Sequence, residues 1–96
     1  MIKMEKNKLL IENKEDFFFI DLRKNGIIIK SGFKMDSAKD WKVTVLDDYK
    51  YSECVVLLAL FLEKTLYGLN TERLTEKQAN EQAIEIIFNF LSIHNS

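Results

Sequence analysis

The stretch Ser52–Tyr67, with the sequence SECVVLLALFLEKTLY, decides the fold of this chain. The eight residues from Val55 to Leu62 are all apolar, so a helix through them has no polar face. A helix that is apolar all round must be covered all round. In a chain of 96 residues, this run predicts either the central helix of a compact domain or half of an interface with another chain.

The predicted bounds of this first helix are about 49–67. Asp47 and Asp48 stand where N-cap residues belong, and Ser52 is a later alternative. Gly68 follows the last apolar turn and is expected to end the helix in the left-handed conformation that glycine adopts readily.

A second helix is predicted over about 76–93. Thr75 at the N-cap position and Gln78 three residues later have the spacing of a capping box. Apolar side chains recur at helical spacing on one side, and Ile84, Phe88 and Leu91 widen this apolar arc beyond what one sheet normally covers.

Upstream of the helices, residues 17–24 and 27–34 carry the strongest strand signal. Aromatic and β-branched residues dominate both runs, and Asn25-Gly26 lies between them. Asn-Gly supplies the two residues with positive φ that a type I′ turn needs, so we expect a tight β-hairpin around this pair.

A two-residue loop at Asn25-Gly26 fixes the register of the hairpin. Asp21 is then predicted to face Lys30 as an opposite-charge pair, and Phe19 to lie over Gly32. The expected core face carries Phe18, Ile20, Leu22, Ile27, Ile29 and Phe33.

Two further strands complete the expected sheet. Residues 9–11 form a short strand, and residues 41–46 alternate as a half-buried one, with Trp41, Val43 and Val45 on one side. Residues 1–7 are polar and are expected to fray, which leaves a sheet over about 8–46. The prediction is one α+β domain over 1–96: a three- to four-stranded antiparallel sheet packed on two C-terminal helices.

Composition excludes several classes of protein. The net charge of −1 gives no global attraction to nucleic acid or anionic membranes, and the single cysteine cannot form an internal disulfide. The longest apolar run has eight residues, against about 20 for a membrane span. Without a signal peptide, a cytoplasmic location is expected. Many Lys, Ile and Asn residues and no Pro suit AT-rich coding, as in low-GC bacteria and their phages.

Candidate catalytic groups are few. Cys54 and His94 are the one thiol and the one imidazole, and they are too few to hold a structural zinc. Cys54 is expected to be a buried thiol, and His94 to be exposed near a helix C-terminus. The pairs Asp47-Asp48 and Asp36 with Asp40 are more simply helix-cap residues than acid–base or magnesium groups. No phosphate-binding glycine loop occurs, so we expect neither an enzyme nor a cofactor or metal.

Two surfaces remain as candidate binding sites. The side of the hairpin opposite the core carries aromatic and basic residues together, namely Phe17, Phe19, Arg23, Lys30 and Lys34. Exposed aromatics flanked by cations bind single-stranded nucleic acid in several folds, whereas a covering partner protein would explain the same pattern.

The second surface consists of apolar side chains on the two helices that one sheet would not cover, namely Leu57, Phe61, Ile84, Phe88 and Leu91. If the sheet does not cover it, a homodimer through the helices would bury it; in a monomer, Trp41 and Tyr51 would fill the gap.

The function predicted from sequence is a small non-enzymatic protein-interaction module. Its finer form is a phage or mobile-element accessory or inhibitor protein that binds a host protein. Single-stranded nucleic-acid binding is the alternative.

Overall fold

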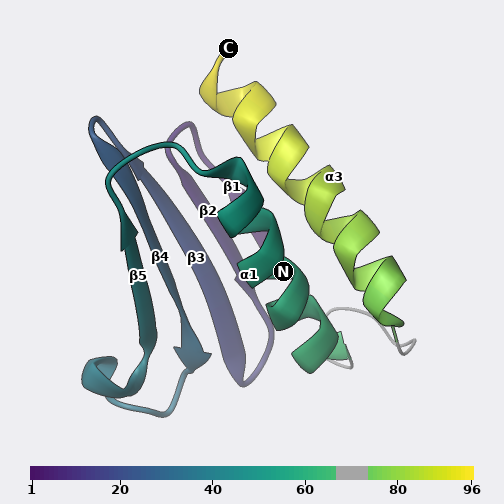
Figure 1. The fold of residues 1–96 in the computed structure, drawn as a ribbon. Coiled ribbons are helices and arrows are strands. Elements are labelled where there is room, and N and C mark those ends of the chain that lie inside the picture. Colours follow the sequence, from purple (N-terminus) through teal and green to yellow (C-terminus); the bar gives the residue numbers. More distant parts are fainter. Residues whose placement is uncertain (67–73) are drawn as a thin grey trace.

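Five strands follow one another along the chain and pair in the same order, each antiparallel to its neighbour. The computed structural model describes residues 1–66 and 74–96. The strands are β1 (Ile2–Met4), β2 (Lys8–Glu12), β3 (Asp16–Arg23), β4 (Gly26–Phe33) and β5 (Lys42–Leu46), with a short 3-10 helix, η1 (Ala38–Asp40), before β5. The helices α1 (Tyr51–Lys64) and α3 (Glu76–His94) come last and both lie on the same face of the sheet (Figure 1). The α+β prediction is confirmed, with five strands in place of three or four.

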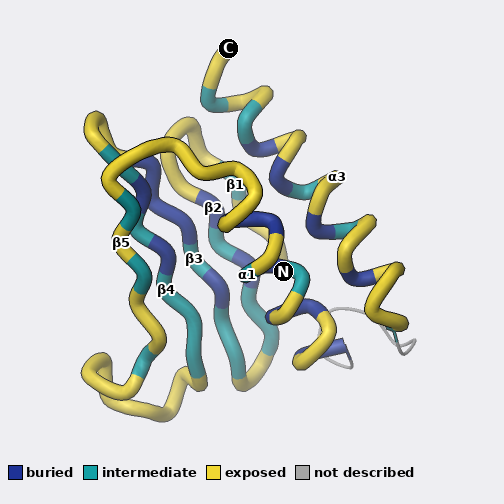
Figure 2. Tube along the Cα trace, viewed as in Figure 1, coloured by how far each residue is buried: buried dark blue, intermediate teal, exposed yellow. Residues whose placement is uncertain are grey.

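The hydrophobic core fills the space between the helices and that face of the sheet. Buried side chains line the inner sides of β2, β3 and β4 and of both helices, whereas β5 is mostly exposed (Figure 2). Phe18 and Phe61 join the two layers, with ring centroids 5.6 Å apart. All but one of the predicted core residues of the hairpin are buried; the exception is Phe33, at the end of β4, which is 38% exposed.

The first residues of the chain differ from the prediction, because they pair with the sheet. Ile2–Met4 form β1 along β2, and the Met1 ammonium donates a hydrogen bond to the Glu12 carbonyl oxygen at 2.7 Å. The apolar side chains of Ile2 and Met4 were too few to mark a strand in the sequence, so only the register with β2 reveals it.

The hairpin register was wrong by two positions. Arg23 pairs with Gly26, so Lys24 and Asn25 form the loop, and neither Asn25 nor Gly26 has a positive φ. Gly26 serves a different purpose, because a Cβ there would clash with the carbonyl oxygen of Leu46 on β5. Close approach of β5, and not turn geometry, therefore requires this glycine.

The difference in register changes which residues pair across the strands but not the side of the sheet on which each side chain lies. Asp21 lies opposite Ile28 and not Lys30, and Phe19 lies opposite Lys30 and not Gly32. A shift by an even number leaves each side chain on its predicted side of the sheet.

The sequence predicted the N-terminal cap of α3 but not that of α1. The capping box at Thr75 is present in full: the Thr75 hydroxyl accepts from the Gln78 backbone N–H, and the Gln78 side chain accepts from the Thr75 N–H. The first helix begins later than predicted, with Lys50 at its N-cap and no side-chain cap, so Asp47 and Asp48 do not cap it. The predicted end at Gly68 lies outside the described residues.

Candidate functional site

The face of the sheet that carries no helix is apolar over four strands. We call it the open face, defined by the side chains that point away from the helices. Its apolar members are Leu10 on β2, Phe17 and Phe19 on β3, Ile28 on β4, Val43 and Val45 on β5, and Trp41 just before β5. Among the described residues, both helices lie on the opposite face of the sheet (Figure 1).

In an antiparallel sheet with one solvent-exposed face, apolar and polar residues normally alternate along each strand. This sheet departs from that rule, since Phe17–Phe19 and Ile27–Ile29 are uninterrupted apolar runs in the two central strands. Strands with such runs are typical of sheets that are covered on both faces. In this sheet, the residues that the structure describes cover only one face.

Strand β5 adds to the open face in a way that the sequence did not predict. Val43 and Val45 were expected to make β5 half-buried, but they point away from the helices and are 51% and 66% exposed. The alternation was correctly recognised, but alternation alone does not tell which side of a strand meets the core. Leu10 and Ile28 were likewise not singled out as site residues.

Basic side chains surround and interrupt this apolar surface. Lys3, Lys8, Arg23, Lys30 and Lys34 lie on the open face with two acidic residues, Glu12 and Asp21, which gives a net charge of +3. The sequence-predicted hairpin residues therefore do share one surface.

Two of these cations are already paired within the chain. Arg23 Nε donates to Asp21 Oδ2 at 2.8 Å, and Lys34 Nζ lies 3.2 Å from Glu12 Oε2. Lys30 lies between Phe19 and Val43 in the register and forms no ion pair with any described residue. The ammonium of Lys30 is thus available to a carboxylate or phosphate from outside.

The aromatic end of the open face is rigidly packed. Phe17 and Trp41 meet edge to face with ring centroids 4.8 Å apart, and the Trp41 indole N–H donates to the Phe33 carbonyl oxygen at 3.3 Å. Gly32 leaves the space that the indole occupies, since a Cβ there would lie 2.8 Å from Trp41 Cδ1. These contacts hold Trp41 in one position beside Phe17.

The second predicted surface is divided by the structure. Phe61 is buried, and Leu57 and Leu91 pack against the core, so these three serve the fold. Ile84 and Phe88 remain exposed on the outer side of α3, and Val56 and Leu60 are exposed on α1. The two helices carry five carboxylates and two lysines, a net charge of −3, opposite in sign to the open face.

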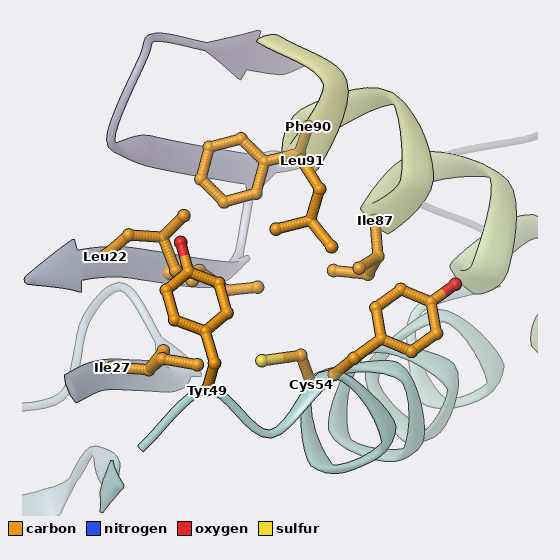
Figure 3. Close-up of a pocket in the computed structure, with 9 residues that line it drawn as sticks. Leu22, Ile27, Tyr49, Cys54, Ile87, Phe90 and Leu91 are labelled. Atoms are coloured by element: carbon orange, nitrogen blue, oxygen red, sulfur yellow. The ribbon is translucent and has the colours of Figure 1, made fainter. Parts of the chain in front are cut away.

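The thiol and the imidazole are not brought together. Cys54 lies in the core beside Leu22, Ile27 and Tyr49 (Figure 3), where burial, and secondarily Glu53, raise the pKa of the thiol to about 11. Reactive thiols have lowered pKa values, so this one is chemically inert. His94 Nδ1 instead lies 2.9 Å from the Lys6 carbonyl oxygen and 3.1 Å from Asn7 Oδ1, which ties the end of α3 to the β1–β2 turn.

Two cavities among the described residues differ greatly in size. The apolar space beside Cys54 measures about 10 Å³, which is at most the size of one water molecule. A groove of about 490 Å³ lies between the end of α1 and the β4–β5 connection, and Asp16, Asp36 and Asp40 are among the residues that line it. No three potential metal ligands gather anywhere in residues 1–66 and 74–96.

Comparison of the chain with protein-family models, with curated proteins and with solved structures finds no significant match. Within the described part of the chain, neither helix has the length and hydrophobicity needed to cross a bilayer. The open face therefore has to be interpreted from its own chemistry.

Proposed function

We propose that this protein is a non-enzymatic protein-binding module and that the open face is its binding surface. The observation that supports this most strongly is that one face of the sheet carries apolar side chains over four strands and is left uncovered by residues 1–66 and 74–96. Exposed apolar surface of this kind, rimmed by polar groups, marks protein interaction sites in soluble proteins.

The arrangement of the face fits protein recognition. Its centre is aliphatic and aromatic, as interface cores are, and its charged groups lie mainly around the edge. Phe19 and Trp41 supply large anchors, and Lys30, which has no ion-pair partner among the described residues, supplies a cation that gives orientation. The AT-rich composition supports the finer proposal of a phage or mobile-element accessory protein whose target is a host protein.

A capture experiment with matched variants tests the proposal. The tagged chain, its Val45→Lys variant and its Met35→Lys variant are used to capture proteins from a low-GC bacterial lysate that also contains an untagged chain with the Val45→Lys substitution. The untagged chain carries this substitution so that its capture depends on the open face of the tagged chain alone. Val45 lies on the open face, whereas Met35 is an equally apolar and highly exposed residue outside the strands. We expect Val45→Lys to lose the captured protein, whether foreign or the untagged chain, and Met35→Lys to retain it.

Two results would count against the proposal. Capture by Val45→Lys as strong as by the parent chain would place binding elsewhere, and no protein above background for the parent chain would remove a protein-binding function. Circular dichroism of both variants shows beforehand that the substitutions leave the fold intact.

Single-stranded nucleic-acid binding is the second candidate, favoured by one observation. Phe19 lies directly opposite Lys30, so a stackable ring and a free cation are neighbours on a face with a net charge of +3. Fluorescence anisotropy with short labelled oligonucleotides tests it: a salt-sensitive affinity that Phe19→Ala and Lys30→Glu abolish would support it. Absence of binding at low salt would eliminate it.

A further inference from the structure

We propose that the occupant of the open face is the outer side of α3 from a second copy of this chain. The copies would then associate head to tail, with the sheet of one against the helices of the next. This inference rests on the proposed function, because it takes the open face to be a protein-binding surface and names the partner.

The outer side of α3 has the chemistry that the open face lacks. Ile84 and Phe88 are one helical turn apart and exposed, and Glu81 and Glu85 lie beside them on the same side of the helix. A helix that brings two apolar side chains and two carboxylates to one surface can bury the apolar centre of the open face and place a carboxylate near the Lys30 ammonium.

Charge selects the head-to-tail arrangement over the symmetric ones. Two open faces packed together would oppose +3 with +3, and two helix layers would oppose −3 with −3. The homodimer through the helices, one of the two alternatives that the sequence left open, is disfavoured for this reason. Sheet against helix layer opposes +3 with −3, and complementary charge both steers association and rejects wrong pairings.

The dimensions of the two surfaces are compatible. The apolar side chains of the open face span β2 to β5, or about 14 Å at the usual strand spacing. Helix α3 has 19 residues and is about 28 Å long, so its central turns can lie across all four strands. A typical stable interface takes about 800 Å² from each partner, a modest share of the 6430 Å² surface of this chain.

When the open face of one copy binds α3 of another, the pair still has one unoccupied open face and one unoccupied α3 surface. Such a contact closes into a ring if the rotation allows and otherwise continues as an open chain. The purified protein is therefore expected to form species larger than its 11.3 kDa mass, which grow with concentration and shrink with added salt.

A pair of matched variants tests this arrangement directly. Val45 on the open face and Phe88 on α3 are each 66% exposed, so lysine is tolerated at both positions. Light scattering and sedimentation velocity of purified Val45→Lys and of purified Phe88→Lys should each give a monomer. An equimolar mixture should give a 1:1 dimer of twice 11.3 kDa, because the intact helix of the first variant meets the intact open face of the second.

The alternative outcomes are distinct and each overturns the inference. A parent chain that stays monomeric up to millimolar concentration has no self-association. Loss of association in Phe88→Lys alone indicates a symmetric helix-to-helix dimer, and loss in Val45→Lys alone indicates a symmetric sheet-to-sheet dimer. A mixture that stays monomeric excludes the head-to-tail contact. If the parent chain is monomeric while capture of a foreign protein still depends on Val45, this inference fails and the proposed function stands.

Discussion

The indole of Trp41 lies directly over Gly32, in space that any other residue at position 32 would fill. A Cβ on Gly32 would be 2.8 Å from Trp41 Cδ1 and 3.4 Å from the Trp41 Cα. The glycine on β4 thus allows the tryptophan that precedes β5 to pack against Phe17. This contact joins three strands at one end of the open face.

Substitution of Gly32 by valine is expected to displace the indole and to lower the free energy of unfolding by about 1–3 kcal/mol, as overpacking does. Urea unfolding followed by the fluorescence of Trp41, the single tryptophan, measures both effects. In a Trp41→Ala background, where circular dichroism replaces fluorescence as the probe of unfolding, the same substitution should cost much less, because the clashing group is gone. Equal costs in the two backgrounds would contradict this account.

Two leucines on α1 give a matched test of the core. Leu58 is fully buried and Leu60 is 54% exposed on the same helix. Leu58→Ala should lower the free energy of unfolding by about 2–5 kcal/mol, because it removes buried methyl groups and leaves a cavity. Leu60→Ala should change it by no more than about 0.5 kcal/mol. Similar losses for both, measured by urea unfolding, would mean that α1 is oriented differently.

Sequence patterns predicted those features of the fold that depend on local chemistry. The capping box at Thr75, the alternation in residues 41–46 and the buried side of the hairpin all follow from residue type and spacing. The strand β1 and the role of Gly26 could not be predicted, because both depend on contacts with strands distant in sequence. The hairpin register failed for the same reason.

The candidate site was predicted in part. Phe17, Phe19 and Lys30 were recognised as a surface because aromatic and basic residues alternate with core residues in one strand pair. Val43 and Val45 were missed, since β5 offers its apolar side to the open face and only the β4–β5 register shows this. Arg23 and Lys34 were expected as basic members of this surface, and the fold pairs them with Asp21 and Glu12.

The buried thiol of Cys54 makes the free energy of unfolding depend on pH in the alkaline range. The pKa of Cys54 is about 11 in the folded chain, against an ordinary value of 9.0. Between these values the unfolded chain loses a proton that the folded chain keeps, so stability falls as pH rises from about 9 to about 11. Below pH 8 both states hold the proton and the effect vanishes.

Comparison with Cys54→Ala measures this effect together with a smaller one on Tyr49, whose pKa is raised by burial and, to a lesser extent, by Cys54. The difference in unfolding free energy between parent and variant should shrink as pH rises from 8 to 10.5, in urea unfolding experiments under reducing conditions. A difference that stays constant over this range would show that the thiol ionises equally in both states.

The capping box makes Thr75 a stabilising residue at the start of α3. Thr75→Ala removes the acceptor for the Gln78 backbone N–H and should cost about 0.5–2 kcal/mol. Ser92→Ala, on the exposed side of the same helix, serves as the control and should be nearly neutral. Thermal unfolding by circular dichroism measures both, and equal shifts in Tm would show that the cap contributes nothing.

Arg23 and Lys30 are both basic residues of the open face, but the structure gives them different roles. Arg23 satisfies Asp21, whose side chain is only 9% exposed. Arg23→Met would leave that carboxylate without its partner and should lower the free energy of unfolding by about 1–3 kcal/mol. A second substitution, Asp21→Val, should recover much of this loss, because it removes the unpaired charge and suits a strand.

Lys30→Met is the matched comparison, since Lys30 has no carboxylate partner among the described residues. This variant should keep the stability of the parent chain in urea unfolding and weaken self-association in sedimentation experiments, because the charge lost is the one that an incoming carboxylate would meet. A stability loss in Lys30→Met as large as that in Arg23→Met would mean that Lys30 belongs to the fold. Binding would then have to depend on the apolar side chains of the open face without it.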